Sequence, residues 1–293
     1  MWFNTTSNVL KQYSLAAGSW ATGNNMNTAR ANLGGAGIQT AALGFGGYDT
    51  ATTGATEEYD GTSWTNSNPL NTARYFLAGA GIQTAGLAFG GTPPTTGATE
   101  EYDGSTWTTS PGSLNTTRER LGGAGTQTAG LAFGGGPPNT GATEEYNGLT
   151  WASNPTGLNT ARQQLAGCGT QTAGLAFGGS TPADTAATEE YDGNSWTSSN
   201  PLITVRSGLA GCGIQTSALA FGGNNPAPGF LSATEEYDGT NWTAGGNLAT
   251  ARYYLGAAGT TAAGLAFGGS APGITAATEE WTAGLQIQTI TVS

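Results

Sequence analysis

The chain has 293 residues, with 8 Lys and Arg, 19 Asp and Glu and no His, which gives a formal net charge of −11. So acidic a chain lacks the cations that binding to a phosphate backbone requires, and we expect no nucleic-acid partner. It has no run of about 18 apolar residues, so we expect no insertion into a membrane. Without histidine, the commonest acid–base and metal-binding side chain is missing.

The first 29 residues precede the regular part of the sequence. They do not combine a charged start with an apolar stretch, so we expect no signal peptide. Residues 19–22, Ser-Trp-Ala-Thr, match the last strand of the repeat described next. Trp2 and Phe3 lie outside the repeat, and we expect them to cover a closing strand, with burial against another chain as the alternative.

From residue 30 onward, one pattern repeats six times. Each unit starts with an arginine, continues through a Gly- and Ala-rich stretch that ends in Gly-Gly, and then carries Glu-Glu followed by an aromatic residue. The arginines are Arg30, Arg74, Arg118, Arg162, Arg206 and Arg252. A constant period of about 44 residues is the signature of a repeat architecture.

Each unit reads as four short strands, as the second one illustrates. We predict strands over Leu77–Thr84 and Gly86–Gly90, a third strand that holds Glu100–Tyr102 and a fourth that holds Trp107. Asp103-Gly104, before the fourth strand, is a dipeptide that tight hairpin turns favour. Four antiparallel strands in a repeat of this length predict an all-β fold, a six-bladed β-propeller in which residues 1–293 form one domain.

The Gly-Gly, Tyr and Trp positions resemble those of the kelch repeat family, over roughly residues 13–281, with Trp281 in place of the last Tyr. The units are also similar to kelch-like proteins of marine bacteriophages and viral metagenomes. That likeness implies a virion component, such as a fibre, tail or capsid appendage, which is made in the host cytoplasm and recognises a host-surface glycan or protein. Its other partners would be virion proteins. A cytoplasmic location is the alternative.

The last unit has three strands but no clear fourth one before residues 282–293. We expect the N-terminal strand around Trp20 to complete this blade. The alternating tail Leu285–Val292 is then expected to add a further outer strand, or to supply the fourth strand itself. Both arrangements bring the termini together and remove exposed sheet edges. Residues 1–29 and 282–293 are therefore predicted to be closing or attachment segments.

In a four-stranded meander, the loops that enter the first strand share one side with the loops between the second and third strands. Sequence variation concentrates there, and a constant scaffold with variable loops on one face is typical of a binding surface. Aromatic residues on this face suit stacking on sugar rings or anchoring a protein partner. The candidate ligand-binding residues are the six arginines together with Tyr75, Phe76, Arg120, Tyr253 and Tyr254.

The six arginines allow two interpretations. They could form a cationic ring that captures a carboxylate or sulfate, or that binds an acidic peptide in an intracellular or secreted protein-interaction module. They could instead pair with a glutamate of their own unit, which we favour because an unpaired buried charge is costly.

We expect no enzyme activity, metal or cofactor. The two glutamates of each Glu-Glu pair point to opposite faces of a strand, so they cannot flank one scissile bond. Asp49, Glu119 and Asp184 are the acidic residues outside the repeated pattern, and they come from three different units. A carbohydrate-active enzyme is therefore the least favoured hypothesis. Cys168 and Cys212 are expected to be small buried residues.

Overall fold

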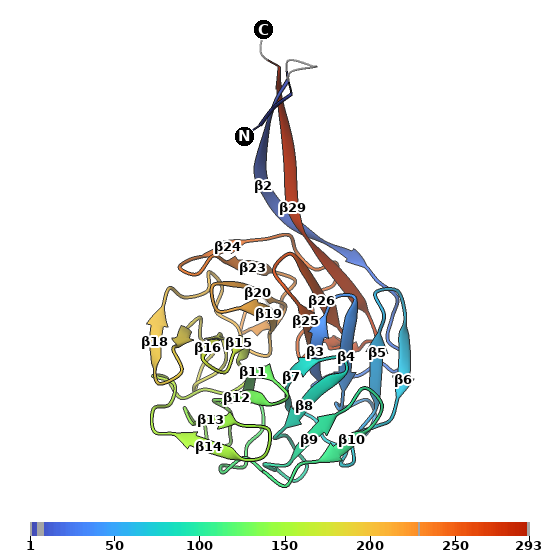
Figure 1. Ribbon diagram of the computed structural model, residues 1–293, viewed down its shortest axis with the longest axis vertical. Coiled ribbons are helices and arrows are strands. Elements are labelled where there is room, and N and C mark those ends of the chain that lie inside the picture. The colour runs from blue at the N-terminus through green and yellow to red at the C-terminus, as the bar shows by residue number, and fades with distance from the viewer. Residues whose placement is uncertain (1, 5–8, 228, 292–293) are drawn as a thin grey trace.

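The computed structural model describes residues 2–4, 9–227 and 229–291, with the backbone alone for residues 2–4, 9–16 and 285–291. Six sheets lie around a central axis as blades, with their innermost strands nearest that axis (Figure 1). The predicted six-bladed β-propeller is confirmed. No helix in the described residues is long and apolar enough to cross a bilayer.

The blades follow one another along the chain, and in each blade the strands are ordered from the axis to the rim. Blade 1 contains β3 (Gly34–Ile38), β4 (Ala41–Phe45), β5 (Thr56–Tyr59) and β6 (Trp64–Ser67). Blade 2 contains β7 (Ala78–Ile82), β8 (Ala85–Phe89), β9 (Thr99–Tyr102) and β10 (Trp107–Thr109). Blade 3 contains β11 (Gly122–Thr126), β12 (Ala129–Phe133), β13 (Thr143–Tyr146) and β14 (Trp151–Asn154).

The second half of the ring repeats this order. Blade 4 contains β15 (Ala166–Thr170), β16 (Ala173–Phe177), β17 (Thr188–Tyr191) and β18 (Trp196–Ser199). Blade 5 contains β19 (Ala210–Ile214), β20 (Ser217–Phe221), β23 (Thr234–Tyr237) and β24 (Trp242–Ala244). Blade 6 contains β25 (Gly256–Gly259), β26 (Ala263–Phe267), β29 (Thr278–Thr291) and β2 (Val9–Thr22), with β1 (Trp2–Asn4) paired to β2. Two small hairpins sit in loops, namely β21 (Asn224–Asn225) with β22 (Gly229–Phe230), and β27 (Ser270–Ala271) with β28 (Gly273–Ile274).

The inner strands consist of small residues because they approach one another closely around the axis. A Cβ atom on Gly79 would lie 2.6 Å from the backbone oxygen of Gly35 in the preceding blade, which is too close for any side chain. The channel that these strands surround is accordingly lined by Gly and Ala for much of its length. The inner strand of blade 2 is also shorter than predicted, because Gln83 and Thr84 form the turn that follows it.

Neighbouring blades are joined by the aromatic residues of the repeat. The Phe89 ring of blade 2 lies 4.9 Å from the Trp151 ring of blade 3, measured between centroids. Trp151 Nε1 also donates a hydrogen bond of 2.8 Å to Thr99 Oγ1 of blade 2. The same tryptophan-to-threonine bond occurs at all six junctions, in the pairs Trp20–Thr234, Trp64–Thr278, Trp107–Thr56, Trp151–Thr99, Trp196–Thr143 and Trp242–Thr188.

Blade 6 is closed by the N-terminal segment, as predicted. Its outer strand is β2, and Trp20 there takes the place that the fourth-strand tryptophan has in the other blades. Trp20 also contacts Phe221 of blade 5, with 4.8 Å between ring centroids. Closure thus joins the two ends of the chain in one sheet.

The prediction for the tail was wrong. The tail neither adds an outer strand nor supplies the fourth one, because β29 continues through Trp281 without a turn and keeps its antiparallel pairing with β2 as far as Val9 and Thr291. The two strands leave the rim of the disc together as a ribbon (Figure 1). The side chains of Trp2 and Phe3 lie outside the described part, so their predicted role stays untested.

Replacement of Trp20 by Ala is expected to destabilise the ring by about 3 kcal/mol, near the lower end for a Trp→Ala change in a core. The change removes the bond to Thr234 and the contact with Phe221. Trp20→Phe keeps the ring contact and should cost only about 1 kcal/mol for the lost hydrogen bond. The midpoint of urea unfolding measures both effects. An unchanged midpoint for Trp20→Ala would show that β2 does not close the ring in solution.

Candidate functional site

The arginine that starts each unit is buried inside its own blade. Arg74 is 1% exposed, and its Nη1 lies 3.0 Å from Glu100 Oε1, where Glu100 is the first glutamate of the Glu-Glu pair. The other oxygen of this carboxylate accepts a backbone hydrogen bond of 2.7 Å from Asn71 in the loop before the arginine. The same ion pair forms in every blade, as Arg30–Glu57, Arg74–Glu100, Arg118–Glu144, Arg162–Glu189, Arg206–Glu235 and Arg252–Glu279.

These pairs correct the idea of an accessible ring of arginines. All six side chains are at most 1% exposed, and each contacts a carboxylate. Burial lowers the pKa of Arg30 and Arg118 to about 10, and the nearby carboxylate opposes the shift in each case. An acidic peptide could not reach these guanidinium groups without opening a blade. The structural pairing is the arrangement observed.

The position two residues after each arginine forms a closed ring around the axis. The backbone N–H of Phe76 donates to the carbonyl of Asn32, and the same bond of 2.8–2.9 Å links each blade to the preceding one until the circle closes. The members are Asn32, Phe76, Arg120, Gln164, Gly208 and Tyr254. All six have φ between 55° and 59°, in the left-handed region, although only one is glycine. Non-glycine residues with such backbones are uncommon and often mark functional sites.

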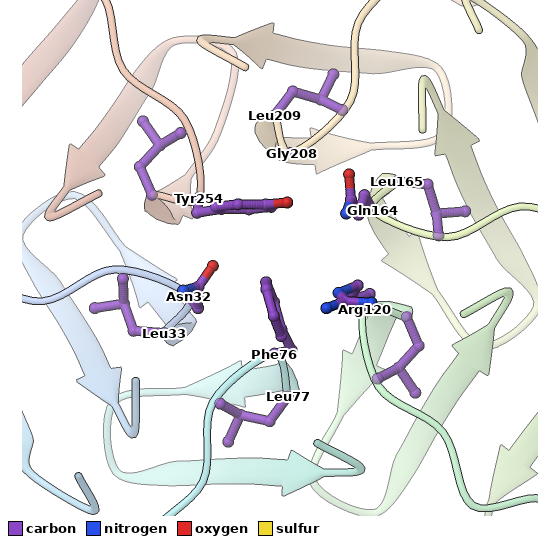
Figure 2. A pocket seen from close by; sticks show the side chains of 12 residues that line it. Asn32, Leu33, Phe76, Leu77, Arg120, Gln164, Leu165, Gly208, Leu209 and Tyr254 are labelled. Atoms are coloured by element: carbon purple, nitrogen blue, oxygen red, sulfur yellow. The ribbon is translucent and has the colours of Figure 1, made fainter. Parts of the chain in front are cut away.

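The side chains of this ring surround a pocket on the axis with a volume of about 130 Å³. Figure 2 shows Asn32, Phe76, Arg120, Gln164 and Tyr254 directed toward its centre, each from a different blade. Six leucines, one following each ring residue, line the pocket behind them. Within the described part of the chain, its lining includes none of the six paired arginines.

Arg120 is held at the edge of the pocket by contacts with three neighbours. Its guanidinium carbon lies 4.3 Å from the centroid of the Phe76 ring, a cation–π arrangement. Its Nη1 is 3.2 Å from Glu119 Oε1 and donates a bond of 3.5 Å to Gln163 Oε1. The side chain is 28% exposed. Among the side chains that the structure describes, it is the one cation outside the buried pairs.

A continuous row of aromatic rings crosses the mouth of the pocket. Successive ring centroids are 4.4–5.7 Å apart, and the Phe230 and Tyr253 rings are stacked at 12°. We call this row the aromatic arc, and its members in order are Tyr48, Tyr75, Phe76, Tyr254, Tyr253 and Phe230. The end residues Tyr48 and Phe230 are 38% and 37% exposed, so a ligand can reach the arc from both sides. Burial raises the pKa of Tyr254, which therefore keeps its proton at neutral pH.

The structure divides the predicted site residues into two groups. Phe76, Arg120 and Tyr254 line the pocket, and Tyr75 and Tyr253 lie beside it in the arc. The six first-position arginines do not take part. Sequence reasoning missed Asn32, Gln164, Tyr48 and Phe230. Their place in the repeat is the sequence signal that could have identified them. Asn32 and Gln164 each follow an arginine by two residues, and Tyr48 and Phe230 lie in the variable loops between second and third strands.

The acidic residues outside the repeat do not converge. Asp49 is partly buried and accepts backbone hydrogen bonds from Ala51 and Thr50, which lower its pKa. Glu119 is buried against Arg120 and accepts a bond from Thr95 Oγ1. Asp184 lies in another blade, and none of the three belongs to the pocket lining in the described residues. No group of three or more potential metal ligands occurs in the described part of the chain.

No protein-family model matches the chain, and no curated protein matches its sequence. The fold thus defines the class of protein, a six-bladed β-propeller. Such a fold suggests a binding or interaction module, with function carried by the particular site. The kelch resemblance stays a prediction from the repeated motif.

Replacement of Glu100 by Gln is expected to destabilise the protein by about 3–5 kcal/mol, because it leaves the buried Arg74 charge without a counter-charge. The neighbouring Glu101 accepts a hydrogen bond of 2.6 Å from Tyr146 and is half-buried, so Glu101→Gln should cost only about 1 kcal/mol. Urea unfolding of both variants gives the comparison. Equal midpoints for the two would argue against a buried structural ion pair.

Replacement of Gln164 by Val is expected to cost about 1–2 kcal/mol, because a β-branched residue fits poorly at a φ of 56°. Gln164→Gly loses the same amide but should stay within about 1 kcal/mol of the parent, since glycine occupies this position in blade 5. Gln163→Val is the control at the adjacent position, where φ is not positive. If Gln164→Val and Gln163→Val lower the thermal midpoint equally, backbone strain in the ring is not the cause.

Proposed function

We propose that the protein is a non-enzymatic binding propeller that recognises a glycan through the aromatic arc. The observation that carries this proposal is the unbroken row of six aromatic rings across the pocket mouth. The C–H bonds on one face of a sugar ring carry small positive charges and pack well on the negative face of an aromatic ring. Several rings in succession provide room for more than one sugar.

The scaffold supports this use because the arc is separate from the contacts that hold the blades together. The tryptophans, the buried ion pairs and the Gly-Gly corners lie within or between blades, whereas arc residues are exposed or half-buried on the mouth face. Rigid aromatic side chains in a fixed arrangement lose little conformational entropy when a ligand binds. A preformed arc is therefore suited to an extended, weakly hydrophobic ligand.

We also propose that the propeller is a virion appendage that recognises a host surface, as the resemblance to phage proteins implies. The ribbon of β2 and β29 supports this proposal, because it leaves the propeller at its rim. Attachment to a particle through this ribbon would leave the mouth face uncovered (Figure 1). Mass spectrometry of purified virus particles that encode the chain tests the setting. Absence of the chain from such particles would contradict it.

The double variant Tyr75→Ala/Tyr253→Ala is expected to bind glycans at least about tenfold more weakly than the parent protein, because it removes the second and the fifth of the six rings and so interrupts the arc on both sides of the pocket. Both positions follow an arginine directly, and blade 1 already carries alanine there as Ala31. The ring backbone should therefore tolerate both changes. A glycan array followed by calorimetry on the positive glycans gives the measurement.

Ile82→Ala is the matched control, since this exposed side chain lies at the opposite end of the inner strand of blade 2. It should bind like the parent. A blank array with folded parent protein overturns the glycan proposal. Equal loss of binding in the control and the double variant would place recognition away from the arc.

A further inference from the structure

The polar side chains of the axial pocket are hydrogen-bond donors. Four polar side chains face it, namely Asn32, Arg120, Gln164 and Tyr254, and all of them can donate hydrogen bonds (Figure 2). No Asp or Glu occurs in its lining within the described residues. The guanidinium group of Arg120 is paired with Glu119, which lies outside the lining, so the preference for an anionic group rests on the N–H and O–H donors that line the pocket together with Arg120.

Two buried atoms at the pocket also lack hydrogen-bond partners. Asn32 Oδ1 is an acceptor without a donor, and Arg120 Nε lacks an acceptor, as do the Nε atoms of the six paired arginines. Buried polar atoms are rarely left unpaired unless a water molecule, an ion or a ligand completes them. Of the two atoms, Asn32 Oδ1 is the one particular to this pocket, and a ligand hydroxyl that donates to it would complete it.

The size of the pocket limits what enters it. A volume of about 130 Å³ lies below the range of about 300–1,000 Å³ typical of sites that enclose a whole small molecule. It is sufficient for one end of a ligand whose remainder lies on the aromatic arc. Phe76 and Tyr254 belong to both the pocket and the arc, so a single ligand can contact the two regions continuously.

We propose that the axial pocket binds the carboxylate of a sugar acid, with Arg120 as its cationic contact, and that the glycan recognised by the arc is therefore acidic. This inference rests on the proposed glycan-binding function and adds the chemical class of the ligand. The carboxylate accepts hydrogen bonds from Arg120, Gln164 and Tyr254, and a ring hydroxyl donates to Asn32 Oδ1. Glu119 holds Nη1 of Arg120 on the far side and so fixes the orientation of the guanidinium group.

The test compares a galacturonate trimer with the same trimer whose carboxyl groups are methyl-esterified, by calorimetry with the full chain. The parent protein should bind the acid at least about tenfold more tightly than the ester, as expected for a charge-assisted contact. Arg120→Gln should bind the two trimers equally. Glutamine is a conservative choice, because blade 4 carries Gln164 at this ring position with the same φ of 56°. Arg120→Lys should keep part of the preference, since it keeps the charge.

The outcomes separate the two proposals. Equal binding of acid and ester by the parent protein, or a preference that survives Arg120→Gln, overturns the carboxylate pocket but leaves the glycan-binding arc intact. A glycan array that shows only neutral ligands has the same meaning. A blank array together with no binding of either trimer overturns both proposals. Ile82→Ala serves as the control, because this exposed side chain lies at the far end of the inner strand of blade 2 and should leave the preference for the acid within about twofold.

Discussion

The buried ion pair between the first arginine and the first glutamate of each blade determines how charge is used throughout this protein. It ties the loop that enters a blade to the third strand of that blade, as in Arg74 and Glu100 with Asn71. Breaking such a pair would leave a charge in a dry interior, so both partners must be kept. These pairs bury six of the chain's eight Lys and Arg side chains, so Arg120 is the cationic side chain that the structure shows at the mouth.

The repeat made most of the fold predictable, because six copies of one pattern act as an internal comparison. Trp20 was assigned correctly to blade 6, since residues 19–22 match the fourth strand of the other units. The path of the tail was not predictable, because alternation indicates a strand but does not name its partner. The ring of residues with a left-handed backbone could not be predicted either. Gly208 is a residue type that favours a positive φ, but Phe76 at the same position of blade 2 gives no sign of one. The aromatic loop residues Tyr48 and Phe230 become part of the site only through folding.

Between-blade contacts explain which positions are constant. The second glycine of each Gly-Gly pair donates its N–H to the backbone oxygen of the next blade's arginine, as Gly47 does to Arg74. Gln83 donates to Ala42 O and Tyr59 O of the preceding blade, a role that the sequence did not reveal. Blade 6 lacks this glutamine and has Thr261 instead, which bonds to Ser217 at 2.7 Å. The junction between blades 5 and 6 therefore replaces the glutamine contact with a bond between hydroxyl groups, while it keeps the tryptophan-to-threonine bond through Trp20 and Thr234.

The closed hydrogen-bond ring at the mouth has a consequence for recognition. Each ring residue uses its backbone N–H and carbonyl on its two neighbours, so neither is free to serve as the main contact for a ligand. Selectivity must then come from side chains, and these can differ between blades because the ring is held by backbone atoms alone. The left-handed backbone limits the choice to residues that tolerate it, which excludes β-branched ones most strongly. Amide, aromatic and guanidinium side chains satisfy this limit, and together they form the donor-rich pocket beneath the aromatic arc.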